Sequence, residues 1–187
     1  MPQAKRAKRR PKRVKRVLNV VPSRDTERDW QLEQADAAGL LAAAPAAVPR
    51  SKDLREEWWK IGDQGSTGSC VGWATADALM RWHFTKAGRI KQTDALSKRF
   101  IWMASKETDE FISSPSTFIE NAGTSLKAAL DVARKFGAVR EPVLPFSGAL
   151  YPGKPETFYA LAAQLKIRAY FNLGDSIEPP RLRDRLK

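Results

Sequence analysis

The chain contains a single cysteine, Cys70, and the residues before it are of the kinds that acyl-transfer chemistry requires. The loop Asp63-Gln64-Gly65-Ser66-Thr67-Gly68-Ser69 leads into Cys70 at the start of an expected helix. A thiolate is favoured at a helix N-terminus, where unpaired backbone N–H groups and the helix dipole stabilise negative charge. The Gln64 side chain and the Cys70 backbone N–H can both donate to a carbonyl oxygen that becomes negative during attack. The sequence therefore predicts Cys70 as a nucleophile and Gln64 as an oxyanion-hole donor.

Both residues also have an ordinary structural interpretation. A free cysteine is among the most buried residue types and usually packs as a small hydrophobic side chain. A lone cysteine is weak evidence for catalysis, and a glutamine in a loop is by default a surface residue. We favour the catalytic interpretation because the glutamine, the glycines and Gly68-Ser69-Cys70 occur together.

A second segment, residues 121–146, has the pattern of a capped amphipathic helix. Thr124 or Ser125 is the expected N-cap, and Gly137 is the expected C-terminal stop. The apolar residues at helical spacing are Leu126, Ala129, Leu130 and Ala133. This pattern by itself implies no function.

Together the two segments resemble the papain-like cysteine peptidases. In that family a Gln, a Gly-rich loop and Gly-Ser-Cys precede a helix, and a glycine before a later helix pairs with substrate backbone. Cys70 matches the nucleophile and Gln64 the oxyanion-hole donor, while Gly68, Ser69 and Gly123 match substrate-binding positions. The chain departs from the pattern in two places. Val71-Gly72 replaces the family's aromatic after the cysteine, and Thr67 stands where secreted members carry a further cysteine.

The resemblance implies a papain-like α+β fold, of which this chain is the mainly α-helical left-hand half. Val48-Pro49 followed by Asp53-Leu54-Arg55 is similar to the opening of the mature family domain, so we expect the peptidase domain to span 48–187. The implied activity is hydrolysis of peptide or protein substrates through a Cys thiolate, with no cofactor. The sequence shows no cluster of metal-ligand residues. The missing loop cysteine fits a reducing, cytoplasmic location.

The general base is missing from this pattern. Cysteine nucleophiles need an imidazole to take the thiol proton, and the one histidine is His83. If 70–83 is one helix, a rise of about 1.5 Å per residue separates its ends by roughly 20 Å. We therefore expect His83 to be structural and the domain to be incomplete, with its His and Asn outside this sequence. The alternative is a catalytically inactive papain-like protein, or a binding module.

Residues 1–16 carry nine of the chain's 12 units of net positive charge and no acidic residue. Such a self-repelling tail is expected to be disordered. It can bind nucleic acid or another polyanion without sequence preference. The alternatives are a solvated tail that has no partner, and an address signal. No apolar run approaches the length of a membrane span.

Residues 17–47 form either an extended arm or a short pro-region. Many papain-like peptidases carry an N-terminal segment that lies along the cleft until it is removed. We favour an arm packed on the domain through Trp30, because no helical propeptide pattern of useful length is present.

The remaining elements are predicted from apolar spacing and breakers. A helix from Cys70 to about Lys86 is expected to bury Ala74, Ala78, Leu79 and Trp82, and to end at Gly88. The other predictions are helices over 94–107 and 156–164, a loop over 108–122, a strand over 167–173 and the start of a helix over 181–187.

Overall fold

A computed structural model describes residues 18–40, 51–108 and 122–173 of the chain. These residues form helices joined by extended segments and turns, with isolated β-bridges instead of a sheet. The helices are η1 (Thr26–Arg28), α1 (Leu32–Ala37), α2 (Cys70–Gly72), η2 (Trp73–Met80), α3 (Arg81–Lys86), α4 (Lys98–Thr108), α5 (Leu126–Lys135) and α6 (Pro155–Ala163). The mainly helical character expected for this half of the fold is therefore seen in the described residues.

The predicted helix from Cys70 to Lys86 is present as α2, η2 and α3, which follow one another without a break. Trp73 and Arg81, at the two junctions, both keep right-handed helical backbone angles. Gly88, with a φ of 68°, ends the helix as expected. The middle portion, η2, is π-helical, and nothing in the sequence indicated this wider winding.

The buried face of this helix was predicted wrongly. Ala74 is exposed and Leu79 is 41% exposed. The buried positions are instead Val71, Gly72, Thr75, Ala76, Asp77, Met80 and Phe84. The wider π-helical turns rotate the residues away from the 3.6-residue period on which the prediction rested.

Helix α4 begins at Lys98, four residues later than predicted. Ser97 acts as its cap, because the Ser97 Oγ accepts a hydrogen bond of 3.0 Å from the Phe100 N–H and donates one of 2.7 Å to the Leu144 carbonyl. Asp94 belongs to a turn, where its carboxylate accepts the Lys91 N–H at 3.0 Å. The contact of Ser97 with Leu144, which lies far away in the sequence, accompanies the later start.

Helix α5 begins and ends where local chemistry predicted. The Ser125 side chain accepts a hydrogen bond of 3.1 Å from the Ala128 N–H, and Gly137 has a φ of 94°. A side chain at Gly137 would also overlap the backbone of Ala162 in α6. The buried face was only partly correct: it comprises Ala128, Ala129, Val132 and Ala133, whereas Leu126 is 51% exposed.

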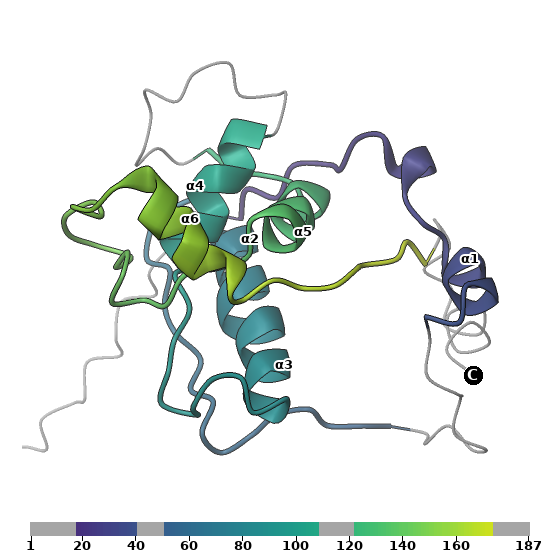
Figure 1. Ribbon diagram of the computed structural model, residues 1–187, viewed down its shortest axis with the longest axis horizontal. Helices are drawn as coiled ribbons and strands as arrows, with labels where there is room; N and C mark the ends of the chain where they lie inside the picture. The colour runs from purple at the N-terminus through teal and green to yellow at the C-terminus, as the bar shows by residue number, and fades with distance from the viewer. Residues whose placement is uncertain (1–17, 41–50, 109–121, 174–187) are drawn as a thin grey trace, which may run out of the picture.

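The core lies where α4 packs against both α5 and η2, and Figure 1 shows the ribbons of α4 and α5 beside one another. Ile101 of α4, Met80 of η2 and Val132 of α5 are almost completely buried there. Helix α6 covers a further side, and its Phe158 ring lies 5.1 Å from that of Phe100, in an edge-to-face contact. The α6 bounds agree with the predicted helix to within a residue at each end.

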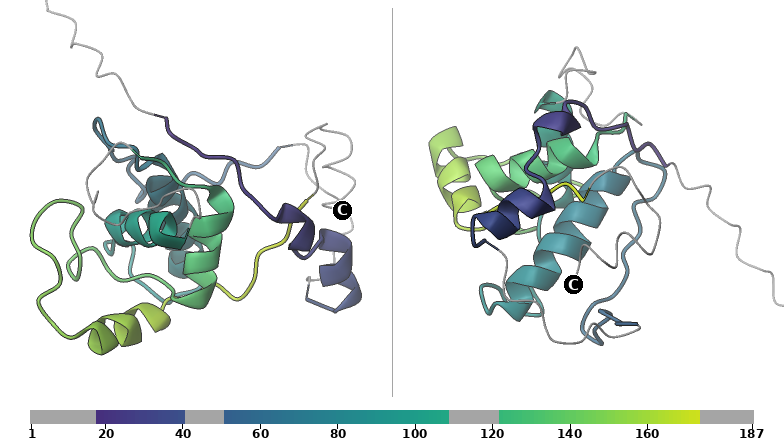
Figure 2. Two further views of the ribbon diagram at one scale, coloured as in Figure 1. Left: turned by 90° about the horizontal axis from the view of Figure 1, so that it is seen from above. Right: turned by 90° about the vertical axis from the view of Figure 1, so that its right-hand side faces the viewer.

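The N-terminal arm, residues 18–40, runs over the helical body, and its helix α1 stands away from the other helices (Figures 1 and 2). The segment after α6 runs out to meet it. The Asn172 N–H donates to the Trp30 carbonyl at 2.8 Å, and the Leu32 N–H donates to the Asn172 carbonyl at 3.3 Å. The strand predicted over 167–173 is therefore wrong as a regular strand, since these residues contribute a single bridge, with Gln31. Trp30 is 55% exposed, so its indole is not the anchor of the arm.

Other predictions fall outside the described residues. They include the basic tail 1–16, the stretch 41–50, most of the loop between α4 and α5, and the helix over 181–187. In the part of the chain that is described, no helix is both long and apolar enough to cross a bilayer.

Candidate active site

The loop before Cys70 is held in shape by short-range hydrogen bonds. The Gln64 Nε2 donates to the Thr67 carbonyl at 2.9 Å, and the Thr67 Oγ1 donates to the Gln64 carbonyl at 2.8 Å. The Thr67 and Ser69 hydroxyl groups are 2.6 Å apart. Gly65, with a φ of 63°, makes the turn that this closure requires. Gln64 is thereby tied to the loop that ends at the helix start.

Cys70 is the first residue of α2 and is a free, half-buried thiol. Its neighbours on either side in the sequence, Ser69 and Val71, are almost completely buried. A helix leaves its first backbone N–H groups without intrahelical partners, so the Cys70 N–H points out of the helix end. Cys70 is thus partly exposed, has a hydrogen-bond donor in its own backbone N–H, and directly follows the Gln64 loop in the sequence. Gly68, before Ser69, is also buried.

Helix α4 connects the cysteine helix to the second predicted site segment. A Cβ atom on Gly72 would lie 2.6 Å from the Lys98 carbonyl oxygen and 2.7 Å from the Trp102 Cβ. The Trp102 indole N–H in turn donates to the Ala122 carbonyl at 3.0 Å, directly before Gly123. Trp102 therefore contacts both the helical turn that follows Cys70 and the residue that precedes Gly123.

Gly123 lies beneath the N-terminal arm. A Cβ atom at this position would overlap the backbone carbonyl group of Asn19. The next residues form a parallel bridge, Val20 with Thr124, and the Val21 N–H donates to the Thr124 carbonyl at 3.1 Å. The backbone that was predicted to pair with substrate is thus paired with residues 19–21 of the same chain.

His83 is not placed to serve Cys70. It lies in α3, at the other end of the same continuous helix, and it is exposed. Its ring makes an edge-to-face contact with Trp82 at 4.9 Å. The structural role predicted for His83 agrees with this position, and no other histidine is present in the 187 residues.

An ion pair between buried Lys98 and half-buried Glu141, beside the cysteine helix, was not foreseen. The Lys98 Nζ lies 3.1 Å from the Glu141 Oε2 and 4.8 Å from the centre of the Trp73 ring, one turn after Cys70. Phe146 packs edge-on against Trp73 at 5.4 Å, and its N–H donates to Glu141 at 2.7 Å. These contacts fix the orientation of Trp73. No local pattern links Lys98 with Glu141, because the pair joins residues that are distant in the sequence.

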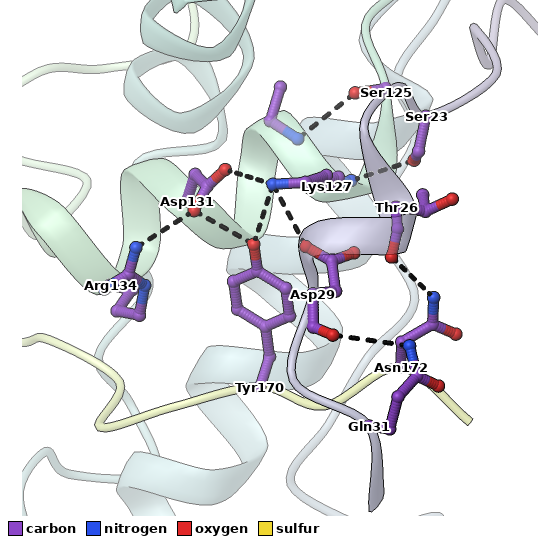
Figure 3. Close-up of polar contacts among 11 residues, drawn as sticks. Ser23, Thr26, Asp29, Gln31, Ser125, Lys127, Asp131, Arg134, Tyr170 and Asn172 are labelled. Carbon is purple, nitrogen blue, oxygen red and sulfur yellow. Dashed lines mark hydrogen bonds and ion pairs between the residues drawn. The ribbon is translucent and has the colours of Figure 1, made fainter. Parts of the chain in front are cut away.

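A second polar cluster attaches the arm to α5 (Figure 3). The Lys127 Nζ lies 3.2 Å from Asp29 of the arm, 3.0 Å from Asp131 one turn along α5, and 3.3 Å from the Tyr170 hydroxyl. The Tyr170 hydroxyl donates to Asp131 at 3.0 Å. The Ser23 hydroxyl of the arm accepts the backbone N–H of Lys127 at 3.2 Å. We call Asp29, Lys127, Asp131 and Tyr170 the arm latch. In the sequence only the i,i+4 pair in α5 indicated it.

The pKa values in the arm latch are shifted by these contacts. Burial alone would lower the pKa of Lys127, but its hydrogen bonds to Asp131, Tyr170 and Asp29 raise it overall. Burial alone would raise the pKa of Asp131, yet hydrogen bonds from Lys127 and Tyr170 hold it below its usual value. For Tyr170 burial dominates and the pKa is raised. The charged form of Lys127 is therefore stabilised in part by Asp29 of the arm, whereas the charged form of Asp131 is stabilised by Lys127 and Tyr170.

Comparison with known proteins finds similarity in three dimensions but not in sequence. No protein-family model matches the chain, and no curated protein matches it. Among solved structures, it is similar to xylellain, a cysteine protease from Xylella fastidiosa, with a TM-score of 0.65 and 19% sequence identity. The chain has a papain-like cysteine protease fold. The match covers 89% of this chain and 62% of the xylellain chain, so the chain spans less than two thirds of that structure.

The fold places the predicted residues in two groups. Gln64, Gly68, Ser69 and Cys70 lie together at the start of α2, and Gly123 lies across Trp102 from them. Among the described residues, no group of three or more His, Cys, Asp or Glu side chains is arranged to hold a metal ion.

Proposed function

We propose that the chain is the helical part of a papain-like cysteine peptidase of the C1 type, with Cys70 as its nucleophile. The observation that carries this proposal is the half-buried free thiol at the first position of α2, beside the closed Gln64 loop, in a cysteine protease fold. A cysteine that only packs in the core requires neither a position at the start of a helix nor the closed Gln64 loop before it. The proposed substrates are peptides or proteins.

In the proposed reaction the Cys70 thiolate attacks the peptide carbonyl carbon. The Gln64 side-chain amide and the Cys70 backbone N–H donate to the oxygen as it becomes negative, which lowers the barrier. The proposed backbone partner of the substrate is Gly123, with Gly68 and Ser69 shaping the approach to the thiol. The leaving amine departs with a proton, and water then releases the acyl group from the sulfur.

The base for this reaction is proposed to come from outside these 187 residues. General-base assistance is typically worth about 10²- to 10⁴-fold in rate, and exposed His83 at the far end of the helix cannot provide it. We infer that the chain alone turns over peptides slowly at best. Thr67 stands where secreted members of the family carry a further cysteine, and this suits the proposed cytoplasmic location.

The position of Asn19 favours the pro-region alternative for residues 17–47. Its carbonyl group covers Gly123, and Val21 is hydrogen-bonded to Thr124. We propose that the arm occupies the backbone position that a substrate would use, so removal of the arm is expected to expose it. The boundary of the peptidase domain proper is then near residue 48.

A second candidate function is a non-enzymatic one, in which the basic tail binds nucleic acid or another polyanion. It is favoured by nine basic residues within 1–16 and by the absence of a second histidine in the chain. In this case Cys70 would be dispensable for the protein's role.

Turnover of fluorogenic peptides distinguishes these functions. The chain would be assayed alone and joined to the sequence that follows it in its reading frame, with Cys70→Ala as the matched control for each form. We expect cleavage from the longer form, lost in Cys70→Ala, and little from the 187 residues alone. If the longer form cleaves no peptide, or if Cys70→Ala retains the activity, the peptidase proposal is wrong.

A further inference from the structure

A pocket of about 600 Å³ lies where the arm, α5 and the segment 168–171 meet. All four residues of the arm latch line this pocket, and Figure 3 shows Arg134 and Tyr170 of its wall. The side chains that matter to its chemistry are Arg28, Trp30, Arg134, Arg168, Tyr170 and Phe171. Three segments far apart in the sequence therefore build one concave surface.

The ionic groups of the pocket wall leave an excess of positive charge. Lys127 is already matched by Asp29 and Asp131, and Arg134 donates to Asp131 at 3.3 Å. The guanidinium groups of Arg28 and Arg168, by contrast, have no polar partner within the described residues.

The remaining carboxylate of the wall is Asp25, which precedes η1. Four cationic side chains thus face three anionic ones in this wall. Guanidinium groups form paired hydrogen bonds with carboxylates and phosphates, so the unmatched arginines are suited to a compact anion.

The rest of the wall is aromatic. Trp30 is 55% exposed, while Tyr170 and Phe171 are half-buried. Flat apolar rings beside a few polar groups are the usual lining of small-molecule sites, because the rings supply contact area and the polar groups set the orientation. An exposed tryptophan next to two arginines favours a ligand with a planar body.

We propose that this pocket binds a small molecule that carries a carboxylate or phosphate group on a flat, apolar body. Arg28 and Arg168 hold the anionic group, and the ring of Trp30 covers the flat part. The site is separate from Cys70, and its occupation needs no catalysis.

Binding in this pocket also holds the arm in place. Arg28 and Trp30 belong to the arm, whereas Arg134 and Arg168 belong to the body. The complete pocket exists only while the arm is docked, so a ligand that needs both sides stabilises the docked state. Docking of the same arm pairs residues 19–21 with Gly123 and Thr124. The ligand is therefore expected to keep that backbone covered.

Calorimetric titration of the full chain tests the binding. The probes are phenyl phosphate and benzoate, which separate the two anionic sources, with benzyl alcohol and inorganic phosphate as controls for the ring and the anion alone. Either aromatic anion should bind more tightly than both controls. Arg28→Ala and Arg168→Ala should each weaken binding about tenfold or more. Exposed Lys135 lies on α5 outside the pocket wall, so Lys135→Ala should leave the affinity unchanged.

Three results of this titration would overturn the proposal. The first is no binding of either aromatic anion, and the second is equal binding by the arginine variants and Lys135→Ala. The third is binding of inorganic phosphate as tight as that of phenyl phosphate, which would indicate a simple anion site.

Hydrogen exchange of the Val21 amide tests the link to the arm, because this N–H is bonded to Thr124 only while the arm is docked. At a probe concentration ten times the dissociation constant, its exchange should slow about tenfold. Unchanged exchange on saturation would show that the ligand does not hold the arm. Neither measurement depends on peptidase activity, so a negative result here is distinct from failure of the proposed function.

Discussion

Gly72 is the residue on which the closest helix contact of the site depends. Its Cα faces the Lys98 carbonyl and the Trp102 Cβ, both of which a side chain would crowd. We expect Gly72→Ala to destabilise the fold by about 1–3 kcal/mol, because the crowding atoms include rigid backbone. Urea unfolding measures this change. Ala74→Ser, on the exposed face of the same helix, is the control and should cost less than about 0.5 kcal/mol.

Cys70 is expected to react with iodoacetamide in the folded chain, because it is half-buried and lies at a helix start. The measurement is mass-spectrometric alkylation below the midpoint of a cooperative thermal transition. Deletion of residues 18–40 should not slow this reaction, since the arm contacts identified at the site are with Gly123 and Thr124. Alkylation only above the transition would instead place the sulfur in the core and remove the proposed nucleophile.

At the scale of the elements, the arm latch is the ion-pair attachment of the arm to α5. Lys127→Met would leave Asp29 and Asp131 facing one another without their shared cation. We expect this change to destabilise arm docking by about 1–3 kcal/mol, seen as faster hydrogen exchange of the Val21, Leu32 and Asn172 amides. Lys135→Met, on the exposed side of the same helix, is the matched control. Equal exchange in the two variants would show that the Lys127 charge does not hold the arm.

The arm latch also predicts how the stability of the folded chain depends on pH. The pKa of Asp131 is lowered on folding, so its contribution is present above the usual value of 3.8 and is lost as the pH falls through the lower folded value. The pKa of Lys127 is raised, so its contribution is complete below 10.5 and is lost as the pH rises through the higher folded value. The pKa of Tyr170 is also raised, so it acts in the same direction as Lys127.

Arm docking should therefore weaken as the pH rises above about 10, whereas loss of the Asp131 charge below about pH 4 should destabilise the folded body. The docking of the arm is measured by the proteolytic susceptibility of residues 18–40 at a series of pH values, with a protease that is active over the range. Lys127→Met should flatten the alkaline limb, and an unchanged limb would assign the loss of docking to other groups.

At the scale of the whole molecule, the positive charge is concentrated in residues 1–16. Their deletion should abolish polyanion binding and leave thermal unfolding of the rest unchanged. For each phosphate that the tail no longer neutralises, the slope of log K against log salt should become shallower by about 0.7–0.9. Fluorescence titration with single- and double-stranded oligonucleotides measures this slope. Undiminished binding after the deletion would place the polyanion site on the folded body.

The features that the sequence determined by itself are those set by neighbouring residues. A cap hydroxyl at Ser125 and positive-φ glycines at 88 and 137 act within one turn of a helix, so the ends of α3 and α5 follow from local composition. The same holds for the position of Cys70 after its loop, because the hydrogen bonds that close this loop join residues at most three apart.

Only the tertiary structure decided which faces are buried and what covers the site. The choice of Ser97 over Asp94 as the start of α4 depends on Leu144, 47 residues away. The cover on Gly123 and the arm latch join residues about a hundred positions apart, whose pairing leaves no periodic trace in the sequence. The π-helical winding of η2, which changed the buried face of that helix, also arises from contacts between distant elements. Packing against other elements contributes more free energy than the local preference for a 3.6-residue turn.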